Sequence, residues 1–322
     1  MTVRLGIIST ADINRKIIPA ADASDKVELL AVASRDRRRA EDYAREWEIE
    51  RAYGSYEALL EDPDVEAVYI SLPNTMHCAW SIRAVEAGKH VLCEKPMSRR
   101  PAEVEEAFDA ADRAGRLLME AFMYRHHPQT MRLRELVQEG SIGELRIVRS
   151  AFSYSQYDPA NIRLRTDLEG GSLLDVGCYC VSGSRLLAGE PELVFGQQHV
   201  GPTGTDWAFA GTMRFPGDVV ALFDCGTSLP NRDELEAIGT EGSLFLDDPW
   251  HCQSAVIELR RNGSVERIEV EAANPYQLEL EDLNAAIRGD RPPLLGRADA
   301  LGQVRTIDAL FRSADGGGVV EF

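Results

Sequence analysis

Lys95, Asp175 and Tyr179 are the residues of this chain whose types and spacing best suit proton transfer. Lys95 precedes Pro96, and proline pushes its predecessor into an extended conformation, so the ammonium should project in a defined direction. Asp175 and Tyr179 lie four residues apart in a predicted helix and should share one face. A phenol can give and take a proton when a nearby ammonium lowers its pKa from about 10. We therefore expect Lys95 and Tyr179 to form an acid–base pair.

Both residues also have a plainer interpretation. A lysine in a loop commonly extends its charge into solvent, and a tyrosine on an amphipathic helix is more often a core residue with one satisfied hydroxyl. Spacing alone favours the core interpretation for Tyr179 and does not decide for Lys95.

Over the first ~120 residues, short apolar runs alternate with amphipathic helical stretches, which is typical of βαβ units and a parallel sheet. The strands are expected at residues 3–8, 27–33, 67–71, 90–93 and 117–119. Ligands of open parallel sheets bind at the carboxyl edge of the strands. Two strand ends supply the residues expected at the nicotinamide half of a dinucleotide: Leu72, Pro73, Asn74, His77, Glu94 and Lys95.

From residue 124 the pattern changes to a helix reaching residue 139, a long strand over 145–154, and a Gly-rich turn and helix over 170–187. Later runs alternate apolar and polar residues, which predicts an antiparallel sheet, and two late helices are expected at 275–288 and 297–314. Because 322 residues exceed what one core usually organises, we place a doubly wound domain at 1–123 and a second domain at 124–322.

The first strand leads into a helix at Ile13, where a Rossmann fold carries its GxGxxG turn. The turn here reads STADIN and contains none of the three glycines. Ser9, Thr10 and Ala11 are nevertheless small, and N–H groups at a helix start can hold a pyrophosphate, with Ala11 expected closest to it. An ordinary strand–helix turn is the alternative.

After the second predicted strand the chain has Ser34 and Arg35, where NAD enzymes usually place an acidic residue for the ribose 2′-hydroxyl. A guanidinium can pair with a 2′-phosphate and stack on adenine. We therefore expect NADP rather than NAD, with Arg35 as the first phosphate ligand and Arg39 as the second. A solvated, arginine-rich helix start is the alternative.

Composition excludes several classes of protein. A net charge of −18 would repel nucleic acid and anionic membranes, and no apolar run approaches the ~20 residues of a membrane span. The N-terminus does not resemble a signal peptide, so we expect a cytoplasmic protein. Six scattered cysteines predict buried thiols without a disulfide framework or zinc site. His126 and His127 face different directions on a helix, His127 towards solvent, and we expect no metal.

These residues together resemble the glucose-fructose oxidoreductase, inositol dehydrogenase and rhizopine-catabolism (Gfo/Idh/MocA) family over nearly the whole chain. The segments that carry the resemblance are 6–14, 94–96 (Glu-Lys-Pro), 120–128 and 175–179. The resemblance implies an α/β fold with an N-terminal Rossmann domain and a C-terminal α/β domain. The open, mainly antiparallel sheet of that second domain commonly forms the interface of a homodimer or homotetramer. The resemblance also implies that Lys95 is the catalytic lysine.

Many family members have a histidine four residues after the aspartate, whereas this chain has Tyr179. The difference favours a branch that resembles NADP-dependent D-xylose 1-dehydrogenases, aldose oxidoreductases and dimeric dihydrodiol dehydrogenases. In this branch Tyr179 would take the proton of a sugar hydroxyl and Lys95 would stabilise the resulting charge. Asp175 would orient either the substrate or the Lys95 ammonium. Arg163 would bind a substrate hydroxyl or the nicotinamide amide, and Tyr124 would form a platform for a sugar face.

Other functions stay open. Within enzymes, the alternatives are a trans-dihydrodiol dehydrogenase or a keto-sugar reductase. From another class, the alternative is a catalytically silent NADP-binding regulator, against which the presence of both Lys95 and Tyr179 argues.

The cofactor preference can be tested at Arg35. Arg35→Asp should shift the ratio of catalytic efficiencies from NADP towards NAD, because a carboxylate repels the 2′-phosphate and accepts a hydrogen bond from the 2′-hydroxyl. Steady-state kinetics with both cofactors measures the ratio. An unchanged ratio would show that the 2′-phosphate lies elsewhere.

Overall fold

The apolar runs near the N-terminus form a six-stranded parallel sheet in the computed structural model, which describes residues 1–322. The strand order is β3-β2-β1-β4-β5-β6. The strands are β1 (Val3–Ile8), β2 (Val27–Ala33), β3 (Arg51–Tyr53), β4 (Ala67–Ile70), β5 (His90–Glu94) and β6 (Leu118–Ala121). All the predicted strands are present, whereas β3 was missed because three half-buried residues show no apolar run.

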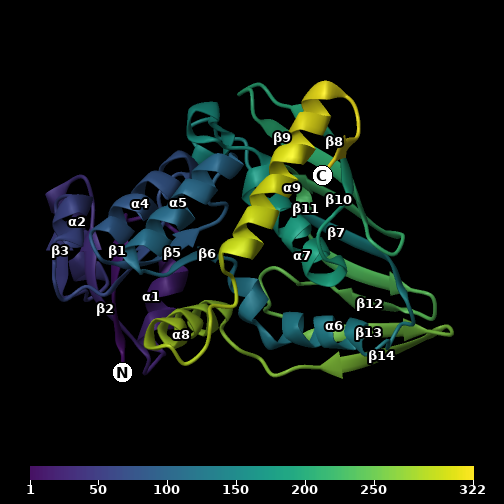
Figure 1. Ribbon diagram of the computed structural model, residues 1–322, viewed down its shortest axis with the longest axis horizontal. Coiled ribbons are helices and arrows are strands. Elements are labelled where there is room, and N and C mark those ends of the chain that lie inside the picture. Colours follow the sequence, from purple (N-terminus) through teal and green to yellow (C-terminus); the bar gives the residue numbers. More distant parts are fainter. The chain divides into compact units, whose positions relative to one another are not determined.

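Helices cover both faces of this sheet (Figure 1). They are α1 (Asn14–Asp22), α2 (Arg37–Glu46), α3 (Tyr56–Leu60), α4 (His77–Glu86), α5 (Pro101–Ala114) and α8 (Pro275–Arg288). Right-handed crossovers leave β1 in one direction and β4 in the other, which distributes the helices over the two faces. The point of divergence, between β1 and β4, is where such folds bind ligands.

Residues far apart in the sequence share the core of this unit. Leu5, Ile7 and Leu92 of the sheet are fully buried together with Leu280 and Leu283 of α8. Burying each such side chain contributes roughly 1.5–3 kcal/mol, so α8 packs here although it follows the second sheet in the sequence.

The later strands form a nine-stranded sheet with the order β14-β13-β12-β11-β7-β10-β9-β8-β15. They are β7 (Leu145–Ser155), β8 (Leu193–Val200), β9 (Asp206–Phe215), β10 (Val219–Gly226), β11 (Ser228–Gly239), β12 (Ser243–Leu246), β13 (Val256–Arg261), β14 (Ser264–Glu269) and β15 (Val320–Glu321). Every pairing is antiparallel except that of β7 with β10. The predicted mainly antiparallel sheet is therefore confirmed.

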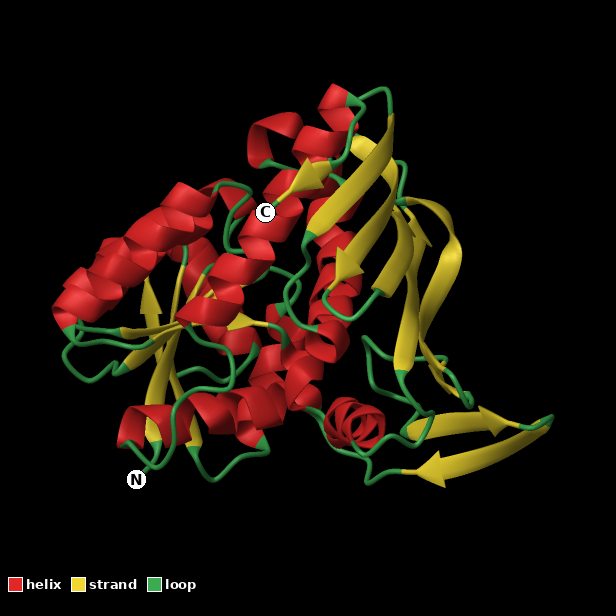
Figure 2. Ribbon diagram, turned by 45° about the vertical axis from the view of Figure 1, so that its right-hand side comes forward, coloured by secondary structure: helices red, strands yellow, loops and turns green.

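Helices pack on one face of this sheet and leave the other face open (Figure 2). They are α6 (Pro128–Gln138), α7 (Cys178–Ala188) and the later part of α9 (Arg297–Gly316). The open face has a hollow of about 510 Å³ whose lining includes Phe195, Leu222 and Phe245. No helix in the structure combines the length and apolar character that a bilayer span requires.

The chain divides into a first unit of residues 1–123 and 274–301 and a second unit of residues 124–273 and 302–322. A single boundary after residue 123 does not describe this division, because α8 and the start of α9 belong to the first unit. All six cysteines are buried and free, as predicted from their scattered positions.

One local prediction is refined and another needs correction. The helix expected after the Gly-rich turn, within residues 170–187, begins with a five-residue π-helical segment, Leu173–Gly177, before α7. His127 was expected to face solvent, but it is fully buried because its Nδ1 accepts the Gln129 N–H at 3.1 Å and caps α6.

Candidate active site

Ser9 occupies the place of the first fingerprint glycine and adopts the backbone conformation that favours glycine, with φ of 124°. Its buried hydroxyl donates to the Ser71 carbonyl at 3.0 Å and accepts the Ala11 N–H at 3.1 Å. Asn14 completes the network, since its amide donates to the Ser9 carbonyl at 3.0 Å and its Oδ1 accepts the Ser71 hydroxyl at 2.7 Å. The side-chain network holds a turn that glycine would otherwise permit at no steric cost.

The start of α1 offers donors to a ligand. Ile13 precedes the helix without a side-chain cap, and the N–H groups of Asp12 and Ile13 have no acceptor within the chain. The Ala11 N–H, expected closest to a phosphate, is engaged by Ser9. Unsatisfied N–H groups at a helix start favour an anion, so Asp12 and Ile13 fit a pyrophosphate best.

The arginines after β2 fall into two groups. Arg37 and Arg38 pair with acidic residues of α2, whereas Arg35 and Arg39 are exposed and form no ion pair. Burial raises the pKa of the Tyr56 phenol, and the positive charges of Arg35 and Arg39 oppose this rise. Two unpaired guanidinium groups are well suited to an added phosphate.

Asp36 and Ser34 shape this region locally. Asp36 is the N-cap of α2 and accepts the Arg39 N–H at 2.8 Å, so its carboxylate is occupied by the helix. Ser34 is buried and its hydroxyl accepts the Asp36 N–H at 3.3 Å. The acidic residue next to Arg35 therefore acts as a helix cap.

His77 connects two strand ends. Its ring nitrogens lie 2.7 Å from the Leu72 carbonyl and 2.8 Å from the Pro96 carbonyl, and the side chain is buried. Burial lowers the pKa of His77, although the two carbonyls favour the charged ring. Since both nitrogens are engaged, His77 supports the Lys95–Pro96 segment rather than offering a ring nitrogen to a ligand.

Glu94 holds Lys95 from the other side. Its carboxylate accepts the Tyr69 hydroxyl through one oxygen and the Lys95 N–H, at 3.3 Å, through the other. Burial raises the pKa of the Tyr69 phenol well above its ordinary value, and the Glu94 charge adds to this rise. Glu279 is fully buried nearby, and burial with the Glu94 charge raises its pKa too. Lys95 is half-buried and directly follows a strand end that the Tyr69 hydrogen bond to Glu94 holds in place.

In the second unit, Tyr179 lies within a group of aromatic rings. Its ring centroid is 5.4 Å from Phe152, 5.7 Å from Tyr124 and 6.0 Å from Trp250. Tyr124 is fully buried and its hydroxyl donates to Ser182 at 2.7 Å. Tyr124 therefore supports the Tyr179 ring, and the buried position differs from the sugar platform expected for it.

Asp175 and Arg163, which the sequence analysis named separately as substrate-binding residues, form an ion pair. Arg163 Nε donates to Asp175 Oδ1 at 3.1 Å, and the Tyr154 hydroxyl donates to Asp175 Oδ2 at 2.5 Å. Burial raises the pKa of Tyr154, and the Asp175 charge contributes. Tyr154 was missed in the sequence, although it follows Phe152 by two residues and so shares its face of β7.

Asp206 fixes the segment that leads to Tyr179. Its Oδ2 accepts the Leu173 N–H at 2.7 Å and the Ser172 hydroxyl at 2.8 Å. A Cβ on Gly171, whose φ is 130°, would lie 2.0 Å from Asp206 Oδ1, so only glycine fits there. Burial raises the pKa of Asp206 to about 6 against these hydrogen bonds. Lys95 belongs to the first unit and Tyr179 to the second, so their cooperation stays a prediction.

Comparison with known proteins decides the family. Residues 3–122 match the description "Oxidoreductase family, NAD-binding Rossmann fold" and residues 130–245 match "GFO/IDH/MocA C-terminal domain". The chain belongs to the Gfo/Idh/MocA family. The predicted family and fold are thereby confirmed, and this Gfo/Idh/MocA protein is a dehydrogenase or reductase acting on CH–OH groups.

Relatives of this Gfo/Idh/MocA protein include "D-xylose 1-dehydrogenase (NADP(+)) 2" of Haloferax volcanii, 38% identical over 98% of each chain. Among solved structures, the aldose-aldose oxidoreductase of Caulobacter crescentus has 28% identity and a TM-score of 0.94 over 100% of each chain. A 3-ketoreductase of Actinomadura kijaniata, solved with NADP and TDP-benzene, has 31% identity and a TM-score of 0.91 over 97% of this chain and 98% of that chain.

The hydrogen bonds of the Ser9 hydroxyl should contribute to the free energy of unfolding, and the positive φ of Ser9 should subtract from it. Ser9→Ala removes the hydrogen bonds and keeps a side chain at positive φ, and should lower the free energy of unfolding by roughly 1–3 kcal/mol. Ser9→Gly loses the same bonds but tolerates the conformation, so its loss should be smaller. Urea denaturation measures both, and a Gly variant less stable than the Ala variant would contradict this account.

Asp206 should make the protein less stable as pH rises. Its folded pKa of about 6 exceeds the ordinary 3.8, so its favourable contribution is complete below the unfolded pKa and is lost as pH rises through the folded one. The wild type should therefore lose about 1 kcal/mol from this group between pH 5 and pH 7. Asp206→Asn keeps an acceptor for Ser172 and Leu173 and should lack this loss. If the free energy of unfolding changed with pH in the same way in the wild type and in Asp206→Asn, the raised pKa of Asp206 would be refuted.

Proposed function

We propose that the chain is an NADP-dependent oxidoreductase that transfers a hydride between nicotinamide and a hydroxyl or aldehyde carbon of a sugar. The absence of ion-pair partners for Arg35 and Arg39, beside a helix start with free N–H groups, is the observation that carries the choice of cofactor. These cations suit the 2′-phosphate, and the N–H groups of Asp12 and Ile13 suit the pyrophosphate. The names of the Haloferax and Caulobacter relatives support a sugar substrate.

When bound, the nicotinamide supplies the acceptor or donor of hydride. In the oxidative direction Tyr179 takes the proton of the substrate hydroxyl, and in the reductive direction it returns one to the oxygen. The aromatic neighbours of Tyr179 restrict its ring, so its hydroxyl is delivered in few orientations. The Lys95 ammonium stabilises negative charge on the phenol oxygen and on the substrate oxygen.

Asp175 and Arg163 would position the substrate. Arg163 is half-exposed in this ion pair, and a second hydrogen bond, from Tyr154, fixes Asp175. Asn74, which follows β4, and Leu72 and Pro73 before it would line the nicotinamide side of the cofactor. The alternatives are that the substrate is a trans-dihydrodiol or a keto-sugar, and the assay below distinguishes a dihydrodiol from an aldose.

A second copy of the chain would cover the open face of the nine-stranded sheet. This face bears exposed Leu222 beside Phe195 and Phe245, with Arg149 and Glu236 around the same hollow. Mixed apolar and charged lining of this kind suits a symmetric contact between copies, either a dimer or a tetramer.

Joint action of Lys95 and Tyr179 predicts non-additive kinetics. Lys95→Ala and Tyr179→Phe should each lower kcat by roughly 10²–10⁴-fold with NADPH binding retained, and the double variant should lose little more than either. NADPH consumption or formation with aldoses, cyclic polyols and dihydrodiols measures this.

Matched controls are Lys26→Ala and Tyr157→Phe, which alter exposed residues of the same types. Full turnover by Lys95→Ala would exclude the catalytic role of that residue. Cofactor binding by the wild type without turnover on any substrate of the panel would favour a regulator instead.

A further inference from the structure

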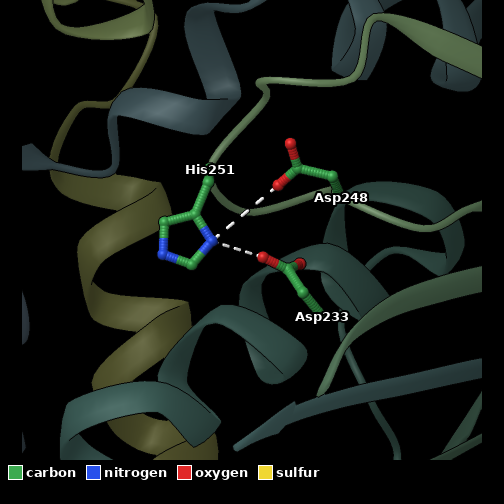
Figure 3. Close-up of side chains that lie close together, drawn as sticks. All are labelled: Asp233, Asp248 and His251. Carbon is green, nitrogen blue, oxygen red and sulfur yellow. Dashed lines mark hydrogen bonds and ion pairs between the residues drawn. The ribbon is translucent and has the colours of Figure 1, made fainter. Parts of the chain in front are cut away.

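Asp233, Asp248 and His251 form a cluster in the second unit that the proposed reaction does not use. Asp233 lies on β11, and Asp248 and His251 lie in the segment between β12 and β13. His251 Nδ1 is 2.5 Å from Asp233 Oδ2 and 3.8 Å from Asp248 Oδ1, and one ligand atom from each residue lies within 4.8 Å of the others. Both carboxylates point towards the same ring nitrogen (Figure 3).

The backbone orients both carboxylates independently of the histidine. Asp233 Oδ1 accepts the Trp250 N–H at 3.2 Å, and Asp248 Oδ2 accepts the N–H groups of Gln253 at 2.5 Å and Ser254 at 2.8 Å. One oxygen of each carboxylate is thus held by the protein and the other is directed at the cluster. Such outer hydrogen bonds are the usual means by which proteins orient metal ligands.

The negative charge of the cluster has no basic counterpart from lysine or arginine. Neither Asp233 nor Asp248 forms an ion pair with such a side chain, and each carboxylate side chain is only 17% exposed. Two adjacent carboxylates with one imidazole between them leave a site for a cation. Burial, with the Asp248 charge, raises the pKa of Asp233, while His251 opposes the rise.

We propose that Asp233, Asp248 and His251 bind a divalent transition-metal ion, of which Zn²⁺ is the best match. Two carboxylate oxygens and one imidazole nitrogen are a recognised zinc ligand set, whereas Mg²⁺ and Ca²⁺ prefer oxygen alone. Tetrahedral zinc with bonds of about 2.0–2.2 Å places ligand atoms roughly 3.3 Å apart. The observed separations of 2.5 and 3.8 Å lie on either side of that value, so small side-chain rotations suffice.

The site is open to solvent and connected to the aromatic group around Tyr179. The His251 side chain is 50% exposed, so water can complete the coordination. Its ring packs edge-on against Phe152 at 5.4 Å, and Phe152 packs edge-on against Tyr179 at the same centroid distance. Trp250 supplies an N–H to Asp233 and a ring to the same group. Metal binding should therefore restrain these rings and alter tryptophan fluorescence.

Metal binding by the full-length chain tests the proposal independently of enzyme activity. After chelator treatment and buffer exchange, titration with ZnCl₂ by calorimetry should give one saturable site per chain. Co²⁺ at the same site should produce the visible absorption of a four-coordinate complex. His251→Ala and Asp248→Asn should each weaken Zn²⁺ binding at least about tenfold, since each removes one of only three protein ligands.

Asp247→Asn is the matched control, because Asp247 is an exposed carboxylate next to Asp248 and should leave Zn²⁺ affinity unchanged. Circular dichroism and NADPH binding verify that each variant is folded. Absence of saturable binding, or equal affinity in His251→Ala and the wild type, would overturn the proposal. Loss of binding in Cys252→Ser with retention in His251→Ala would also overturn it, by assigning the ion to the buried thiol.

Discussion

Hydrogen bonds among Ser9, Ser71 and Asn14 tie the ends of β1 and β4 to the first turn of α1, and the cofactor end of the first unit depends on them. A glycine fingerprint solves the same problem by removing side chains, which lets the backbone turn without steric cost. Here a serine takes the unfavourable φ and its hydroxyl compensates by satisfying neighbouring polar groups. The helix start consequently keeps two N–H groups for a ligand, although no glycine is present.

The same principle operates at the end of β5. Lys95 lies between Glu94, which accepts its N–H, and Pro96, whose carbonyl contacts the buried His77 ring. Burial keeps Tyr69 protonated, so this support stays a neutral donor across the ordinary pH range. Positioning residues of this kind allow a flexible lysine to start from a rigid strand end.

In the second unit, the close approach between Gly171 and Asp206 fixes the backbone that leads to Tyr179. The carboxylate satisfies the first N–H of the π-helical segment, and any side chain at Gly171 would collide with it. The segment then leads directly into α7, where Tyr179 packs among aromatic rings. Tyr179, the proposed proton-transfer residue of this unit, therefore lies on a helix whose start is fixed by one buried acid.

The amino-acid sequence alone determined the elements and the identity of several site residues. Apolar runs, the Glu-Lys-Pro segment and the arginines after β2 are local signals, because a strand or a strand end needs only its neighbours in the chain to be recognised. For this reason the family could be predicted, whereas the roles of Lys95 and Arg35 stay predictions.

Tertiary structure decided which side chains meet. The return of residues 274–301 to the first core, the burial of His127, the contact of Tyr154 with Asp175 and the cluster around His251 were not predicted. Each depends on packing between segments or on a cap formed within a turn. The spacing of apolar residues along the sequence does not predict such contacts. Local patterns specify where a strand or helix lies, whereas the partner of a buried polar group is fixed only when the elements pack.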